Sequence, residues 1–248
     1  MFRNILIGLV VSGSLYAGSL NVAVAANVSY AMDELKKEFV KVSPNTKLRV
    51  TLGSSGKLTA QIKHGAPYEV FMSANMKYPE SLYKSGMAMT KPVVYAQGAL
   101  AMLSSKRRDF SQGVKILEQK SISKIAIANP KTAPYGKAAL EAIEKANLNA
   151  SLKNKFVYAE SISQAVSYAI TAADIGFIAK SSLYSPKMKN YKENIHWRAV
   201  DSKLYTPIKQ GIVILKNAKN SSDAKAFYDF MLSAKAKKIL SDFGYVVQ

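Results

Sequence analysis

The chain is 248 residues long, enough for one large domain or two modest lobes. Hydrophobic residues make up 48% of it and charged residues 21%, so a sizeable core can form, and neither wholesale disorder nor a membrane channel fits. Thirty-five Lys and Arg against sixteen Asp and Glu leave a net charge of +19. Cysteine is absent and only His64 and His196 occur, which excludes disulfides, a Cys nucleophile and thiolate or His-rich metal sites.

The N-terminus has the pattern of a secretory signal. Arg3 provides a basic start, residues 5–11 are apolar but too few to span a bilayer, and small residues lead to Ala17. A buried N-terminal helix is the alternative, but a strand-like run begins at once, at Leu20. We therefore predict a signal peptide over 1–17 and a periplasmic location. No cysteine follows, so a lipoprotein anchor is not expected.

The positive charge points to nucleic acid, acidic membranes or small anions as partners. Lysines are spread along the chain, with no arginine-rich arm and no zinc-finger, RRM or Walker motif. The charge can steer a small anion toward the protein, but it locates no site.

Strand-like and helix-like segments alternate along the chain. Strands are predicted over 21–26, 47–52, 69–72, within 93–104, and over 122–128, 155–158, 175–178 and 208–215. Helices are predicted over 29–42, 58–63, 78–84, 135–146, 161–173 and 222–243. This order predicts an α/β protein with mainly parallel sheets. Two small sheets with a cleft between them fit as well as one large sheet.

Four strand-to-helix junctions carry short polar residues without charge. They are residues 25–29, 53–57, 130–136 and 160–163. Each places free backbone N–H groups at a helix start, where the helix dipole also favours an anion. Ordinary helix capping explains any one junction; the four together are of interest because ligands bind at the carboxyl ends of strands in open α/β sheets. A phosphate ligand would gain from an acceptor for its proton, and Glu160 is the nearest acid.

These junctions give the chain its resemblance to a known family. In order and spacing it resembles the molybdate-binding proteins of bacterial ABC importers, which are periplasmic substrate-binding proteins. The matching segments are 25–32, 53–58, 61–62, 65–67, 70–75, 129–130, 133–136, 226–230 and 243–245.

The resemblance implies a two-lobed periplasmic-binding-protein fold with a ligand cleft between two mixed, mainly parallel sheets. Lobe I is expected over 18–92 plus 205–248, and lobe II over 93–204. The lobes would close on molybdate or tungstate and deliver it to a membrane permease and ATPase complex. The implied oxyanion-binding residues are Ala26, Asn27, Ser54, Ser55, Tyr135 and Ile162. No catalysis, cofactor, directly ligated metal or nucleic acid is implied, and a monomer is expected.

The sequence departs from the family at one donor. Some members place a ligand-contacting tyrosine where this chain has Ala179, so one donor is either missing or supplied elsewhere, for instance by Tyr135. Asn75 stands where many members have an aspartate, and we assign it a structural role.

Three other functions remain to be weighed. The ligand could be sulfate, phosphate, a phosphonate or a small organic anion. A secreted hydrolase would use a serine with His64 or His196, but no G-x-S-x-G elbow is present. Charge alone suggests a nucleic-acid or envelope-surface binder.

Overall fold

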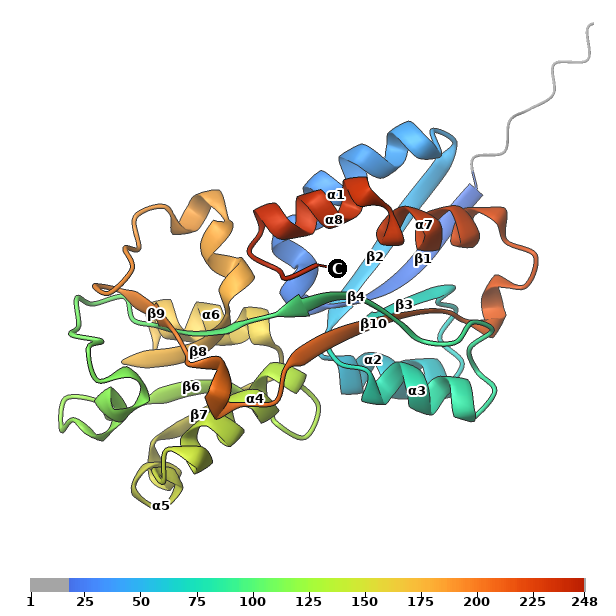
Figure 1. Cartoon of the computed structure of the whole chain (residues 1–248). Coiled ribbons are helices and arrows are strands. Elements are labelled where there is room, and N and C mark those ends of the chain that lie inside the picture. Colours follow the sequence, from blue (N-terminus) through green and yellow to red (C-terminus); the bar gives the residue numbers. More distant parts are fainter. Residues whose placement is uncertain (1–17, 248) are drawn as a thin grey trace, which may run out of the picture.

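The computed structural model of the chain describes residues 18–247 and contains two five-stranded sheets, each with its own helices (Figure 1). The predicted signal peptide, 1–17, lies outside the described residues. Of the two arrangements that the sequence left open, the chain therefore adopts the one with two separate sheets.

The first sheet has strand order β2-β1-β3-β10-β4. Its strands are β1 (Gly18–Ala25), β2 (Thr46–Gly53), β3 (Val70–Ser73), β4 (Val93–Gly98) and β10 (Ile208–Ile214). One face packs against α1 (Ser29–Val42), α7 (Ser222–Leu232) and α8 (Ala234–Asp242), and the other against α2 (Ser55–Lys63) and α3 (Lys77–Lys84) (Figure 1). Helix α1 follows its predicted period, with Met32, Leu35 and Phe39 buried.

The second sheet has strand order β7-β6-β8-β5-β9. Its strands are β5 (Leu100–Leu103), β6 (Ile125–Ala128), β7 (Phe156–Ala159), β8 (Ile175–Ala179) and β9 (Trp197–Ala199). Its α-helices are α4 (Pro134–Lys145), α5 (Asn149–Leu152) and α6 (Ile162–Thr171). The connections include short 3₁₀ turns, namely η2 (Gly113–Glu118), η3 (Lys153–Lys155), η4 (Lys180–Tyr184), η5 (Pro186–Met188), η6 (Ser202–Leu204) and η7 (Lys216–Ala218).

Both sheets are mixed, because β10 and β5 run antiparallel to their neighbours. β1 is parallel to β2 and β3, and β6 is parallel to β7 and β8. β10 is antiparallel to β3 and β4, and β5 is antiparallel to β8 and β9. Parallel and antiparallel pairings are thus equally represented. The parallel pairings put the carboxyl ends of β1, β2, β6 and β7 at the edges from which α1, α2, α4 and α6 begin.

The chain crosses between the sheets at two places. The predicted strand region 93–104 is two strands, since β4 ends in the first sheet at Gly98 and β5 begins in the second at Leu100. The return follows β9 and leads into β10. A Cβ at Gly98 would overlap the Tyr135 hydroxyl and lie 2.7 Å from Gln210 Nε2, so this crossing has no room for a side chain.

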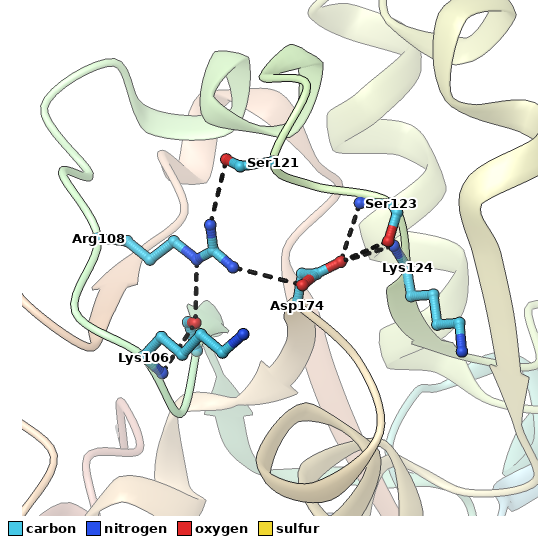
Figure 2. A network of polar contacts seen from close by, with 7 residues as sticks. Lys106, Arg108, Ser121, Ser123, Lys124 and Asp174 are labelled. Atoms are coloured by element: carbon cyan, nitrogen blue, oxygen red, sulfur yellow. Dashed lines mark hydrogen bonds and ion pairs between the residues drawn. The ribbon is translucent and has the colours of Figure 1, made fainter.

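A polar network fixes the loop after β5, away from the crossing strands (Figure 2). The Asp174 carboxylate accepts hydrogen bonds from Ser123 N and Oγ, both at 2.9 Å, and from Lys124 N at 3.0 Å. Arg108 Nη2 lies 3.4 Å from the same carboxylate, and Arg108 Nε donates to Ser104 Oγ. Burial opposes ionisation of Asp174, but these donors outweigh it and lower its pKa below the usual 3.8. The network joins the loop to the starts of β6 and β8.

Candidate functional site

A small cavity lies between the two sheets, and all six predicted site residues line it. The space in it that admits the centre of a water molecule is about 10 Å³. The lining residues are Ala25, Ala26, Asn27, Gly53, Ser54, Ser55, Ala74, Ala133, Pro134, Tyr135 and Ile162. They come from loops that follow β1, β2, β3, β6 and β7, so both sheets contribute. The structure thus brings the predicted residues together; their contact with a ligand stays a prediction.

Four helix starts supply the backbone of this cavity. The 3₁₀ turn η1 (Ala26–Val28) leads into α1, Ser54 precedes α2, Ala133 precedes α4, and Ile162 begins α6. No side chain caps η1, α1, α2 or α4. Among these starts only α6 is capped, by Ser161 Oγ, which accepts from Gln164 N at 3.3 Å. The first N–H groups of a helix have no partner within it, so these starts offer fixed donors to an anion.

Two serines add hydroxyl donors at the start of α2. Ser55 Oγ accepts the Ala74 N–H at 3.0 Å, which leaves the Ser55 proton available to a ligand. Ser54 Oγ is buried and has no partner. Among residues 18–247, Ser54 Oγ and Asn27 Oδ1 are the two buried side-chain polar atoms without a hydrogen bond, and both residues line this cavity. Because such atoms are costly when left unpaired, they indicate a polar ligand here.

Asn27 is held by a buried network behind the cavity. Its Nδ2 donates to Gln210 Oε1 at 2.8 Å and to the Tyr245 hydroxyl at 2.9 Å. Its backbone oxygen accepts from Tyr245 at 2.8 Å and from Ser181 Oγ at 3.1 Å. Gln210 Oε1 also accepts from Tyr95 at 2.8 Å. In this orientation, two hydrogen bonds hold the side chain of Asn27 in the absence of a ligand.

The Tyr135 hydroxyl belongs to the same network. It accepts from Gln210 Nε2 at 3.3 Å and lies against Gly98. Burial, with neighbouring tyrosines, raises the pKa of Tyr135 well above its usual value of 10, so its hydroxyl stays protonated. Because the hydroxyl accepts from Gln210, its own proton is left available, so Tyr135 remains a candidate for the donor absent at Ala179, together with its backbone N–H at the start of α4.

No residue that lines the cavity carries a carboxylate, an amine or an imidazole. Glu160, considered above as a proton acceptor, forms an ion pair with Lys57 instead. His64 follows the last turn of α2, and His196 Nδ1 accepts from Lys192 N at 3.1 Å. Within residues 18–247, no three His, Cys, Asp or Glu residues are grouped as metal ligands. The cavity thus offers neutral donors and no acid–base pair.

Several contacts join the two halves around the cavity. Gly56 N donates to Thr132 O at 2.8 Å, and a Cβ at Gly56 would lie 2.9 Å from Thr132 Cα, so only glycine permits this approach. Ser163 Oγ donates to Ala26 O at 2.8 Å. Together with the Lys57–Glu160 pair, these contacts hold the two sheets' loops against each other around the cavity.

Sequence reasoning missed the residues behind the cavity. Gln210, Tyr95, Tyr245 and Ser181 lie far apart in the chain, and no spacing rule connects them. One signal was present: Gln210 is a polar residue inside the apolar run of β10, and it is fully buried. Asn75 takes the expected structural role, because its Oδ1 accepts from Ser73 Oγ at 3.3 Å next to β3.

In the described part of the chain, every helix is too short or too polar to cross a bilayer.

Comparison with known proteins assigns nearly all of the described residues to one protein family. Residues 20–246 match the family described as bacterial extracellular solute-binding protein. The molybdate-binding proteins ModA of Azotobacter vinelandii and Rhodobacter capsulatus are each 35% identical to it; the matches cover 94% of this chain and 91% and 90% of theirs, respectively.

Solved structures agree with this assignment. The periplasmic molybdate-binding protein of Azotobacter vinelandii superposes with a TM-score of 0.84 at 34% identity, over 92% of this chain and 99% of that one. The sulfate-binding protein SubI of Mycobacterium tuberculosis shares the fold, with a TM-score of 0.73 at 12% identity over 92% of this chain and 86% of that one. Its relatives are named as binding proteins, and the chain belongs to the bacterial extracellular solute-binding protein family.

Proposed function

We propose that this chain is the periplasmic substrate-binding component of an ABC importer, that it captures molybdate and tungstate between its lobes, and that it delivers them to a membrane permease and ATPase complex. The names of its 35% identical relatives support molybdate as the ligand. The observation that carries the proposal is the cavity itself, with four helix starts and two buried side-chain oxygen atoms without a hydrogen bond in an uncharged wall.

The mechanism is capture by closure. Asn27, Ser54 and Ser55 bind the anion from the first sheet, while the starts of α4 and α6 bind it from the second. The division into lobes, expected as 18–92 plus 205–248 and 93–204, remains part of this proposal with one change. Because β4 pairs with β10 in the first sheet, the first boundary moves to the connection between β4 and β5, and this connection and the one before β10 act as hinges. Closure replaces water around the anion with fixed dipoles, which need no reorganisation and no proton transfer.

The same observations support a binding protein without catalysis or cofactor. The cavity wall has no base or nucleophile–base pair, and Tyr135 stays protonated. We propose that the protein acts as a monomer and binds no nucleic acid, since its lysines are dispersed over many elements. The signal pattern over 1–17 and the periplasmic relative support export.

One observation favours a different oxyanion as a second candidate. Asn27 Oδ1 is an unpartnered acceptor at the cavity, and it could take the proton of hydrogen phosphate or a phosphonate. Sulfate lacks this proton and depends on donors alone, as molybdate does.

The experiment is a titration of the protein lacking residues 1–17 with molybdate, tungstate, sulfate and phosphate, followed by calorimetry and thermal shift. A ligand that binds only the folded state raises the unfolding midpoint. Tight binding of molybdate and tungstate with no response to the other two supports the proposal. Binding of sulfate or phosphate instead would show that the protein has a different ligand. No response to any of the four anions would overturn the proposed function.

A further inference from the structure

The buried side chain of Gln210 contacts residues from both halves of the molecule. It is a fully buried amide on β10, the strand that receives the chain on its return from the second sheet. Its side chain contacts Asn27 of the first sheet's loops, Tyr95 of β4 and Tyr135 of α4. It therefore connects a predicted ligand residue from each half.

The observed orientation leaves an electrostatic mismatch. Asn27 Nδ2 uses both protons on Gln210 and Tyr245, and Asn27 Oδ1 remains as a buried acceptor without a partner. An anion needs a donor in its place. An unpaired buried acceptor is unfavourable when the site is empty and more so beside an oxyanion.

A half-turn of both amides removes this mismatch at Asn27, and it takes the Gln210 acceptor away from the Tyr95 proton. Gln210 Nε2 would then donate to Asn27 Oδ1 and to Tyr95, while Gln210 Oε1 would accept from Tyr135. Hydroxyl groups both donate and accept, so Tyr95 and Tyr135 exchange roles without moving. Tyr245 would donate to Asn27 Oδ1 instead of the Asn27 backbone oxygen, which keeps its bond from Ser181. Asn27 Nδ2 becomes free to donate to the ligand.

We propose that Gln210 is a positioning residue for the anion site: the reversible Gln210–Asn27 amide pair decides whether an acceptor or a donor of Asn27 faces the cavity. This inference rests on the proposed function. It gives Asn27 two orientations. With Nδ2 free, Asn27 donates to an oxyanion that has no proton; with Oδ1 free, it accepts from an oxyanion that carries one. Gln210 acts through Asn27 and does not itself line the cavity.

A double-mutant cycle tests the proposal. Gln210→Leu removes the amide at similar volume and leaves the Asn27 side chain with Tyr245 as its remaining partner. We expect molybdate affinity, measured by calorimetry, to fall by about 10- to 100-fold, the usual effect of one lost hydrogen bond to a charged group. Asn27→Ala loses the donor itself. Because Gln210 acts through Asn27, adding Gln210→Leu to Asn27→Ala must produce no further loss.

The control is Gln97→Leu, which changes a glutamine on the neighbouring strand β4 whose side chain takes no part in this network. It should bind molybdate as the unsubstituted protein does. Thermal unfolding without ligand checks the fold of each variant. If Gln210→Leu does not fold, Tyr95→Phe takes its place in the same cycle, since it removes one bond that orients the Gln210 amide.

The outcomes separate the two proposals. Loss of affinity on Gln210→Leu that disappears in the Asn27→Ala background supports the positioning role. Additive losses would show that Gln210 acts on the site by general packing and would overturn it, as would unchanged affinity in the single variant. If the unsubstituted protein binds none of the four oxyanions, the proposed function fails, and this inference fails with it.

Discussion

Replacement of Ser54 by alanine separates ligand binding from stability. Ser54 Oγ is buried and has no partner in the protein, so Ser54→Ala removes no internal hydrogen bond. A hydrogen bond to a charged group contributes about 1.5–3 kcal/mol. If the hydroxyl donates to the anion, its removal weakens molybdate binding by roughly 10- to 150-fold. The unfolding free energy of the ligand-free protein should stay within about 0.5 kcal/mol of the parent value or rise.

Ser55→Ala provides the matched comparison one residue away. Ser55 Oγ accepts the Ala74 N–H, so alanine here also leaves a buried donor unpaired, at a cost of about 1–3 kcal/mol of stability. Calorimetry gives the dissociation constants, and urea denaturation gives the stabilities. Both variants should lose affinity, but only Ser55→Ala should be destabilised. A Ser54→Ala protein that is destabilised yet binds molybdate as tightly as its parent would refute the reasoning.

Three further predictions concern groups outside the cavity wall. Asp174→Asn should lower the unfolding free energy by about 1–3 kcal/mol in urea while molybdate affinity is retained. Because the folded-state pKa of Asp174 is lowered, its stabilisation is present above the usual 3.8 and is lost as pH falls through the lower folded value. The gap in unfolding free energy between parent and variant should therefore narrow as the pH is lowered below about 3.8. Glu160→Gln should change the affinity for molybdate by less than about fivefold, since the Lys57 and Glu160 side chains are 53% and 60% exposed and an exposed ion pair contributes little. A larger effect would mean that this pair controls the closure of the two halves. The His196→Ala variant should bind molybdate in calorimetry as tightly as the parent protein does. Loss of molybdate binding without unfolding would show that the site is misplaced.

Local patterns predicted much of the fold. Helix α1 begins and ends at the predicted residues, because its apolar positions follow one helical face. The run 93–104 was harder, since both of its strands are apolar and one residue separates them. Strand β9 was missed because three residues, each only partly buried, have too little periodicity to be seen.

The candidate site was predictable where it consists of consecutive residues. Helix starts such as 53–57 and 130–136 are visible in the sequence because their chemistry is local. The Asn27–Gln210–Tyr135 network was not, since 183 positions separate Asn27 from Gln210 and 75 separate Gln210 from Tyr135. Long-range pairing of polar groups follows from tertiary structure alone.

The hydrogen-bond donors around the cavity come from both sheets, and this has a consequence for ligand release. The starts of α1 and α2 stay with the first sheet when the halves separate, and those of α4 and α6 stay with the second. If each half supplies half of the binding free energy, an opened protein retains only the square root of the closed-state affinity; a nanomolar site becomes one of about 30 micromolar. A transporter therefore needs only to hold the two halves apart, and the ligand leaves without any competing anion or change of protonation.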